Sequence, residues 1–524
     1  MIQADVLGER ARITPDAPAV VVVEPELRLT YGELDRRAIR CARLWTSLGL
    51  SKGDRVGILA HNRIEYLEAF FAAGKTGVIL VTLGTRLTAV ELEHVVSDSG
   101  LRALLYDGEL AETVGELRRL DGVAGVEHWI GLDEARAADT DPVYGDLVDA
   151  LGPDSAWRPT RCDGEDVYCL LYTSGTTGRP KGVQIPHRQV AWNGYNTVAC
   201  WQLRADDVSP IFTPLYHAGG LLAFLVPIFV IGGTIVLHRG FDAAEVWRTV
   251  QRERCTVILG VPTIWKMLLE APERATTDLS SIRWLISGGA PLPQYLIEAY
   301  QALGIGFLQG FGMTEVGVNC FAMTLADSVA KRGSIGRPMM GTEVRLVDDD
   351  GHDVAEDEVG EMWFRGPHVS QGYWNNPEAT AAALDADGWF RSGDKARRDE
   401  DGFFYVAGRA KDMIISGGVN IYPAEIEAVL LQHPGVEDAA VVAVPDPKWG
   451  EIGIAYLVAR PAGPHDDPGT TGTIPDDDLA AFLAERLARY KTPKGFRWIE
   501  ALPRTAYGKV VKGTLRDLYL GEST

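Results

Sequence analysis

The first part of the chain alternates short apolar runs with longer segments whose apolar residues recur every three or four positions. The short runs predict buried strands and the periodic segments predict helices. Thr30-Tyr31-Gly32-Glu33 and Thr88-Ala89-Val90-Glu91 have capping-box spacing, which marks the first turn of a helix. Strands alternating with helices imply a mostly parallel, helix-covered sheet. We expect its strands at residues 55–59, 77–83 and 102–106.

The same alternation returns in the middle of the chain, and then the pattern changes. Further strands are expected at residues 207–212, 234–237, 256–259 and 282–287. From about Thr342 onward, two alternating runs flank a turn, which is typical of antiparallel hairpins. These runs occupy residues 343–347 and 360–365.

A small separate unit follows Gly408-Arg409. A proline early in a helix favours a helix starting at Pro423. Residues 461–478 are rich in Pro, Gly and Asp and predict a mobile loop. The remaining elements are expected as strands at 436–444 and 452–458 and an amphipathic helix at 476–490.

These patterns predict the α/β fold class with two domains, because 524 residues exceed what one hydrophobic core accommodates. The large N-terminal domain, residues 1–410, would hold helix-covered, mostly parallel sheets plus a β-rich subdomain. The small mobile C-terminal domain, residues 411–524, would be α+β. Residues 219–237 are uncharged and long enough to cross a bilayer, but Pro227 and Gly232-Gly233 interrupt them. A buried helix, a turn and a strand account for this segment without a membrane.

Composition narrows the partners and the compartment. The net charge of −21 disfavours nucleic acid and anionic lipid as general partners, although a local basic cluster can still bind an anionic cofactor. The 6 cysteines form no Cys-x-x-Cys pair, which argues against a disulfide framework or a zinc site. Asp5, Glu9 and Arg10 interrupt any signal-peptide pattern. We therefore expect a cytoplasmic protein.

One stretch carries the chemistry: an apolar run from Val167 to Tyr172 enters a turn rich in glycine and hydroxyl groups that a lysine closes. Glycines let backbone N–H groups approach an anion, hydroxyl groups add donors, and the lysine adds a point charge suited to phosphate. The spacing is not that of a Walker A loop, since Pro180 precedes the lysine. The pattern predicts a polyphosphate-binding loop formed by Thr173, Ser174, Gly175, Thr176, Thr177, Gly178 and Lys181.

The block from Thr173 to Gly182 resembles the phosphate loop of the acyl-adenylate-forming superfamily, which includes acyl-CoA synthetases, peptide-synthetase adenylation domains and beetle luciferases. The resemblance extends over nearly the whole chain, in the superfamily's motif order. It implies ATP, Mg²⁺ and coenzyme A as cofactors. Within the superfamily, the chain is most similar to the stand-alone fatty-acyl and aryl-CoA ligases.

The resemblance implies a nucleotide site built from several motifs. The segment 309–315 is similar to the second nucleotide motif, in which Glu315 would hold Mg²⁺ and Thr314 would donate to phosphate. Phe311 replaces the usual tyrosine and keeps its stacking face. Asp394 would bind the ribose and Arg409 the ribose and phosphate. The remaining nucleotide contacts would be Gln309, Gly310, Gly312, Gly289, Ala290, Pro291 and Val406.

The same resemblance places the acid, the thiol and the catalytic lysine. His217 would border and gate the acyl pocket, with Gly288 leaving room for the acyl group and Val316 beside it. Lys509 would bridge the carboxylate, the α-phosphate and the bridging oxygen, stabilising the charge of the transition state. Together with Thr314, Glu315 and Arg409, it completes the implied catalytic set.

A hinge at Lys411 would let the small domain rotate between two half-reactions. Gly417 and Gly418 would line the phosphopantetheine channel, and Arg86 and Trp449 would contact CoA. The sequence departs from relatives at two CoA positions: Gly84-Thr85 precedes Arg86 in place of Asn-Pro, and Thr492 stands where some relatives have arginine.

These implications lead to an ATP-dependent acyl-CoA synthetase acting on an apolar acid, whether fatty, aryl or polycyclic. The helix predicted after His217 offers no partner for a second charge, and an unpaired buried charge is costly. Three alternatives remain open: a ligase that loads a carrier-protein phosphopantetheine arm, a luciferase-like oxygenase, and a non-catalytic acyl- or nucleotide-binding protein. A homodimer is common in such families.

Overall fold

The computed structural model describes residues 5–152, 157–173, 179–290, 292–416, 419–460, 474–505 and 508–522. Its largest sheet has 6 strands in the order β6-β5-β3-β4-β7-β8, and β8 alone is antiparallel to its neighbour. The three strands predicted here are confirmed, with ends shifted by two residues at most. The strands are β3 (Arg55–Leu59), β4 (Ile79–Thr82), β5 (Ala103–Tyr106), β6 (His128–Gly131), β7 (Val167–Thr173) and β8 (Lys181–Pro186).

Helices cover this sheet, and both predicted capping boxes are present. The Thr30 hydroxyl accepts from the Glu33 N–H while the Glu33 carboxylate accepts from the Thr30 N–H at 2.8 Å, and Thr88 and Glu91 repeat the arrangement. Each box satisfies amide groups that a helix start otherwise leaves unpaired. The helices are α1 (Val6–Ile13), α2 (Tyr31–Ser47), α3 (Ile64–Thr76), α4 (Ala89–Ser99), α5 (Ala111–Leu117) and α6 (Tyr144–Ala150).

Two further sheets have the orders β2-β1-β10-β9 and β11-β12-β13. The sequence predicted β9, β10, β11 and β12, but it missed β13 as well as β1 and β2. Strand β1 joins the sheet by pairing with β10 more than 200 residues away, and β2 pairs with β1. The strands are β1 (Pro18–Val22), β2 (Leu27–Thr30), β9 (Val208–Ile211), β10 (Thr234–Leu237), β11 (Val257–Gly260), β12 (Trp284–Ser287) and β13 (Gly306–Gln309). The helices packed with them are α7 (His187–Cys200), α10 (Ala243–Glu253), α11 (Pro262–Glu270) and α12 (Gln294–Ala302).

The uncharged segment 219–237 folds inside the protein as predicted. It forms α8 (Ala218–Gly220), a π-helical turn η3 (Leu221–Leu225) and α9 (Val226–Ile231), and after Gly232-Gly233 it continues as β10. Residues 221–229 are almost fully buried. Among the helices that the structure describes, none is long and apolar enough to cross a membrane.

An antiparallel sheet in the order β16-β17-β18-β19 forms the predicted β-rich subdomain. Its aromatic core holds Phe364, Phe390 and Phe404. The strands are β16 (Glu343–Val347), β17 (Gly360–Arg365), β18 (Phe390–Arg398) and β19 (Phe404–Arg409). Shorter elements around it are β14 (Phe321–Ala322), α13 (Leu325–Ala330), β15 (Arg337–Pro338) and α14 (Pro377–Ala383).

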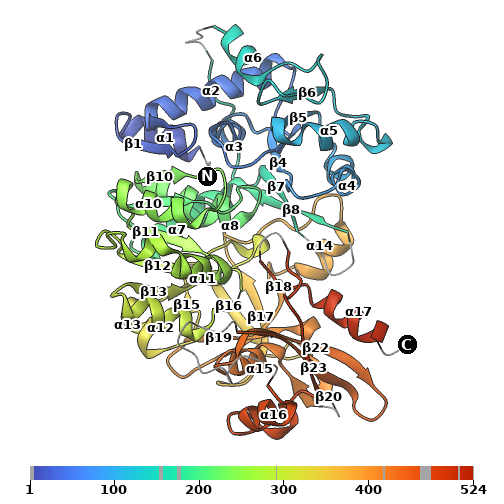
Figure 1. The fold of residues 1–524 in the computed structure, drawn as a ribbon. Coiled ribbons are helices and arrows are strands. Elements are labelled where there is room, and N and C mark those ends of the chain that lie inside the picture. Colours follow the sequence, from blue (N-terminus) through green and yellow to red (C-terminus); the bar gives the residue numbers. More distant parts are fainter. Residues whose placement is uncertain are drawn as a thin grey trace.

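The C-terminal segment forms its own sheet and core below the large body (Figure 1). The predicted helix at 476–490 is too long, because α16 ends at Ala484, after its last buried position, Leu483. The boundary at residue 410 stays a prediction. The elements are β20 (Ile414–Ser416), β21 (Val419–Ile421), α15 (Pro423–Leu430), β22 (Val436–Asp446), β23 (Gly450–Ala459), α16 (Asp476–Ala484), β24 (Gly495–Trp498) and α17 (Lys512–Glu522).

One buried carboxylate fastens the second sheet to the third. Asp207 is 1% exposed and accepts two hydrogen bonds from Arg283, at 2.6 and 2.7 Å, and one from the Thr256 hydroxyl at 2.7 Å. Arg283 precedes β12, Thr256 precedes β11, and the Asp207 carbonyl accepts from Thr234 in β10. The Asp207 side chain, just before β9, therefore joins the second sheet to the starts of β11 and β12 in the third, while its backbone carbonyl pairs with β10.

We expect Asp207→Ala to destabilise the protein by about 3 kcal/mol, since breaking a buried ion pair leaves Arg283 without compensation. Urea unfolding followed by circular dichroism measures the change as a lower midpoint. Asp206→Ala, which alters an exposed neighbour, is the control. Equal midpoints for the two variants would show that Asp207 contributes little to stability.

Candidate active site

The predicted phosphate loop leaves the largest sheet at the end of β7 and returns as β8. Thr173 and Lys181 are opposite one another in the β7–β8 register, so the two ends of the loop lie side by side. This pairing closes the base of the loop as a hairpin. The remaining predicted members, Ser174, Gly175, Thr176, Thr177 and Gly178, lie outside the described residues.

Glu315 lies next to that base, in the short helix η5 (Thr314–Val316). Its side chain is buried, and the Thr173 hydroxyl donates to its Oε1 at 3.4 Å. The Tyr373 hydroxyl donates to the same oxygen at 3.2 Å. Burial raises the pKa of Glu315, while the hydrogen bond from Tyr373 and the positive charges of Arg409 and Lys509 act in the opposite direction.

Two parallel strands bring the predicted adenine and acyl segments together. Ser287 at the end of β12 is level with Gln309 at the end of β13, and the Gly310 N–H donates to the Ser287 carbonyl at 2.8 Å. A Cβ atom on Gly288 would meet nothing within 4 Å, so open space adjoins this residue. A Cβ atom on Gly312 would lie 2.2 Å from the Val318 carbonyl oxygen, a distance that only glycine avoids.

The segments 289–290 and 310–312 follow these strand ends directly, while Pro291 lies outside the described residues. Phe311 lies parallel to the ring of Phe364, with an interplanar angle of 8° and centroids 6.1 Å apart. Val406 packs against the same aromatic core, and Val316 is fully buried within it. Phe311, which follows β13, and Val406 in β19 therefore share one hydrophobic support.

The β18–β19 hairpin pairs the two predicted ribose residues. Asp394 and Arg409 are register partners, and Arg409 Nε lies 3.2 Å from Asp394 Oδ1. Asp394 is 7% exposed. Burial raises its pKa, and the charges of Arg409 and Lys509 oppose the rise. The sequence separates these residues by a turn, and antiparallel pairing makes them neighbours.

Lys509 reaches this group from the C-terminal segment. A Cβ atom on Gly508 would lie 3.1 Å from the Thr263 hydroxyl oxygen in α11, so the loop rests against the large body. Lys509 keeps part of its surface open to solvent, yet the surrounding protein desolvates its ammonium group and lowers its pKa. Arg409 and Lys411 lower the pKa further, whereas Asp394 and Glu315 raise it. These mutual effects place Lys509 within electrostatic reach of the predicted nucleotide site.

His217 precedes α8 and lies beside Tyr216, with ring centroids 4.5 Å apart. Burial lowers the pKa of its imidazole to about 4, and the charge of Lys509 adds to the effect. Asn62 holds the preceding turn, donating to the Thr213 carbonyl at 3.0 Å and accepting from the Leu215 N–H at 2.9 Å. The imidazole is therefore neutral at physiological pH and lies near the predicted catalytic lysine.

The predicted CoA residues are not gathered at this group. Arg86 is exposed in the loop after β4. Trp449 is 43% exposed in the β22–β23 turn, next to Gly450, which pairs with Ser416. Figure 1 shows β4 in the upper body and β20 at the lower end. Gly417 and Gly418 lie outside the described residues.

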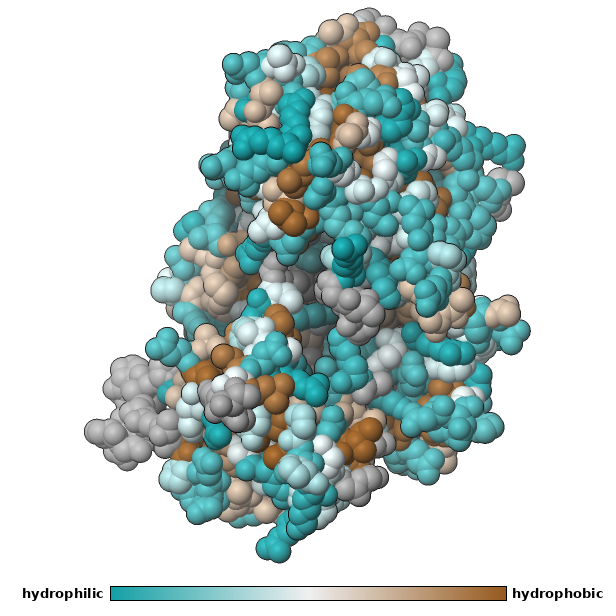
Figure 2. Space-filling view, turned by 90° about the vertical axis from the view of Figure 1, so that its right-hand side faces the viewer, coloured by the Kyte–Doolittle hydropathy of each residue, from teal (hydrophilic) through white to brown (hydrophobic). Residues whose placement is uncertain are grey.

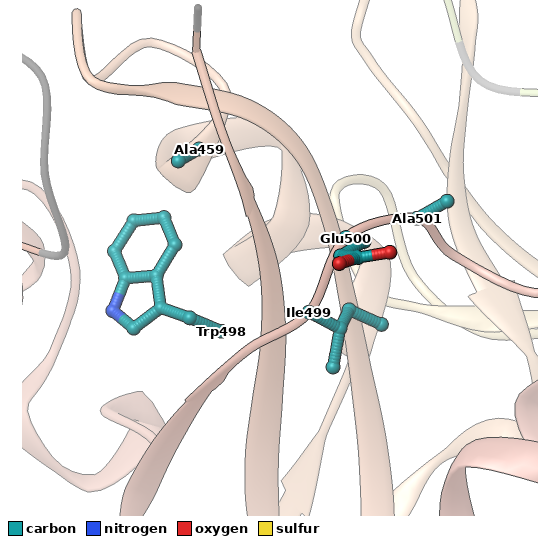
Figure 3. A pocket seen from close by; sticks show the side chains of 5 residues that line it. All are labelled: Ala459, Trp498, Ile499, Glu500 and Ala501. Atoms are coloured by element: carbon teal, nitrogen blue, oxygen red, sulfur yellow. The ribbon is translucent and has the colours of Figure 1, made fainter.

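The surface agrees with a site between the two parts of the chain. Figure 2 shows the face turned toward the viewer hollowed about halfway down, between the larger upper body and the lower part. A second, open pocket lies on the C-terminal segment and is lined by Ala459 and by 498–501 (Figure 3). It contains none of the predicted site residues.

Comparisons with known proteins cover the chain almost from end to end. The profile of the AMP-binding enzyme family matches residues 7–374, and that of the AMP-binding enzyme C-terminal domain matches 425–509. A feruloyl-CoA synthase from Amycolatopsis sp is 42% identical over 507 residues, 97% of each chain. The long-chain-fatty-acid–CoA ligase FadD13 of Mycobacterium tuberculosis is 37% identical over 518 residues, 98% of this chain and 97% of its own.

A solved structure gives the same result in three dimensions. The o-succinylbenzoate coenzyme A synthetase of Bacillus subtilis, in complex with ATP and magnesium ion, is 32% identical with a TM-score of 0.83. The match covers 99% of this chain and 100% of that one. The chain therefore belongs to the AMP-binding enzyme family, and its predicted membership of the acyl-adenylate-forming superfamily is confirmed.

Sequence reasoning missed several residues that support the site. Tyr373 reaches Glu315 from a segment 58 residues further along the chain. Gln189 in α7 donates to the Thr314 carbonyl at 3.0 Å, and the Ser370 N–H donates to the Glu315 carbonyl at 2.8 Å. No local pattern marks these positions, because each acts on a partner that only the folded chain brings near.

The His217 environment predicts a pH response. The pKa of His217 in the folded state, about 4, is below the unfolded value of about 6.5. The contribution of His217 to the free energy of unfolding therefore falls as pH drops from about 6.5 toward 4. Above pH 6.5 the group contributes no pH dependence. NMR titration of labelled histidine, with His217→Asn assigning the signal, measures the pKa. A value near 6.5 in the folded protein would contradict this account of burial.

Proposed function

We propose that this protein, an AMP-forming carboxylic acid–CoA ligase, activates an apolar acid with ATP and transfers the acyl group to the thiol of CoA. One observation carries the proposal. Lys509 of the C-terminal segment lies within electrostatic reach of Glu315 and Asp394 of the large body. Two carboxylates and a lysine with a lowered pKa, next to a phosphate-type hairpin, suit phosphoryl chemistry.

The nucleotide binds across the ends of β7, β12 and β13 and the middle of β18. The loop from Thr173 to Lys181 holds the phosphates, and Asp394 accepts hydrogen bonds from the ribose hydroxyls. The residues 289–291 and the segment 309–312 line the adenine, with the Phe311 ring on one face. Arg409 lies against Asp394 and contacts both ribose and phosphate.

Glu315 and the neighbouring hydroxyl groups fit Mg²⁺. Its carboxylate is buried, and burial alone raises its pKa, so a nearby cation compensates the cost of desolvation. Carboxylate and hydroxyl oxygens are the hard donors that Mg²⁺ prefers. The Bacillus relative binds ATP together with magnesium, which supports the assignment. When bound, the ion neutralises phosphate charge during the displacement.

In the first step, an oxygen of the acid's carboxylate forms a bond to the α-phosphorus, and the bond to the bridging oxygen breaks. Pyrophosphate leaves with that electron pair. Lys509 stabilises the charge that develops on the carboxylate, the α-phosphate and the bridging oxygen. Its lowered pKa stays compatible with this role, because Asp394 and Glu315 both favour the protonated form.

In the second step, the thiol sulfur of CoA bonds to the acyl carbon, AMP leaves, and the thiol proton passes to solvent. The small domain rotates about Lys411, withdraws Lys509 and brings in Gly417-Gly418 and Trp449. This is consistent with a Trp449 that is exposed while Lys509 is at the site. Arg86, in the loop after β4, then contacts CoA.

The acid is apolar because the segment beside His217 offers only apolar side chains. Residues 221–229 are buried and uncharged, so a second charge there would be unpaired and costly. The named relatives act on an aromatic acid and on long-chain fatty acids, which supports both classes as substrates. Both relatives are named for CoA, which favours CoA over a carrier protein as the acceptor.

Pyrophosphate release with Mg-ATP, across fatty, aryl and polycyclic acids with and without CoA, tests the function. We expect acid-dependent pyrophosphate and an acyl-CoA mass for one class. Adenylate without thioester would replace CoA by a carrier protein as the acceptor. Release that requires a dicarboxylic acid would contradict the apolar pocket, and no release with any acid would refute the function.

We expect Lys509→Ala to slow adenylate formation at least about 100-fold, the scale of losing one donor to a developing negative charge. The affinity for ATP, measured by calorimetry, should change by less than about threefold, since Lys509 acts at the reacting centre. Thioester formation from supplied acyl-adenylate should persist. Arg516→Ala, which removes an exposed cation of the same domain, is the control. An undiminished rate would remove Lys509 from the mechanism.

A further inference from the structure

A short segment, 370–374, connects the edge of the phosphate hairpin to η5. The Gln184 N–H donates to the Gly372 carbonyl at 2.9 Å and the Trp374 N–H to the Gly182 carbonyl at 2.7 Å, so the segment extends the sheet beyond β8. Tyr373 bridges to Val183 in antiparallel fashion. At its start, the Ser370 N–H donates to the Glu315 carbonyl. The segment is therefore fixed at both ends to parts of the site.

The side chain of Tyr373 makes two contacts between these ends. Its hydroxyl donates to Glu315 Oε1 at 3.2 Å, and Lys181 Nζ lies over its ring, 5.2 Å from the centroid. Burial and the negative charge of Glu315 raise the pKa of the phenol, so it remains protonated and acts as a donor. One side chain thus contacts both the lysine that closes the phosphate hairpin and the buried glutamate.

We propose that Tyr373 is a positioning residue that sets the Glu315 carboxylate for Mg²⁺ and the Lys181 ammonium for phosphate. The proposal rests on the proposed function, in which these two residues hold the metal and the phosphates. A carboxylate that binds a metal needs a hydrogen bond to fix its orientation. The other hydroxyl group that donates to Glu315, that of Thr173, lies further away at 3.4 Å. The hydrogen bond from Tyr373 is therefore the shorter of the two.

The lysine needs positioning for a different reason. A lysine side chain is flexible and carries its charge at the end of four methylene groups, so it loses much conformational freedom on binding phosphate. An aromatic face holds an ammonium group by electrostatic attraction while leaving its N–H donors available. Tyr373 therefore restricts Lys181 before the nucleotide arrives, and it does so with a different part of the side chain from the one that contacts Glu315.

Two substitutions separate these contacts. Tyr373→Phe removes the hydroxyl and keeps the ring, whereas Tyr373→Leu removes both. For Tyr373→Phe we expect the free Mg²⁺ concentration at half-maximal ATP binding to rise about tenfold. The Kd for ATP at saturating Mg²⁺ should return to the wild-type value. For Tyr373→Leu that Kd should stay about threefold weaker, the share of the cation–π contact. Calorimetry over a Mg²⁺ series measures both.

Tyr106→Phe is the matched control, since it removes a buried phenol that donates to Asp141 at 2.7 Å. Tyr106 lies in β5, which three strands separate from β8 in the sheet. This substitution should leave the Mg²⁺ requirement unchanged. In a Glu315→Gln background, Tyr373→Phe should cause no further shift, whereas a general structural defect would add its own effect. Thermal unfolding of each variant identifies any that fails to fold. The Tyr373→Phe variant by itself is sufficient to test the contact with Glu315.

An unchanged Mg²⁺ requirement in folded Tyr373→Phe would overturn the role at Glu315, and equal Kd values for the Phe and Leu variants at saturating Mg²⁺ would overturn the role at Lys181. If wild-type ATP binding does not depend on Mg²⁺, Glu315 does not hold the metal and the proposal fails. Failure of the acid panel is distinguishable, because binding is measured without any acid.

Discussion

A carboxylate buried at the base of a phosphate hairpin is the constraint on which the site depends. Removing the Glu315 carboxylate from water costs free energy that hydrogen bonds and nearby positive charge must offset. Thr173 and Tyr373 supply the hydrogen bonds, while Arg409 and Lys509 supply charge. These residues come from four separate parts of the chain. The cost of burying this one carboxylate is therefore offset by groups that separate elements supply.

The C-terminal segment adds a second constraint, because in the proposed function it carries residues for both half-reactions and cannot present them together. Lys509 interacts electrostatically with Asp394 and Glu315, while Trp449 is exposed in a turn beside Ser416. Few polar contacts join the segment to the large body among the described residues; Lys266 pairs with Glu437, and Arg460 lies over the ring of Tyr295. Contacts this sparse are compatible with a domain that changes its orientation.

Local pattern accounts for much of the fold. Strand β10 and both capping boxes follow from apolar runs and from Thr-x-x-Glu spacing, whose causes lie within a few residues. The helix predicted at 476–490 was too long, because α16 ends at Ala484 although the next apolar residue, Leu487, still packs partly buried against the same core. Strand β1 escaped prediction because its parallel partner, β10, lies far along the chain, and β2 is a four-residue edge strand that pairs with β1.

At the site, as in the fold, the sequence and the tertiary structure determine different features. The sequence by itself determined the chemical groups, namely a glycine- and hydroxyl-rich loop with Lys181, the acidic residues and a terminal lysine, since motif spacing records which groups a backbone turn can present. Only the tertiary structure decided which groups meet. Asp394 faces Arg409 through strand register, and Tyr373 reaches both Glu315 and Lys181 because an isolated β-bridge pairs it with Val183 in β8. Such contacts depend on distances through space, which no local pattern of residues encodes.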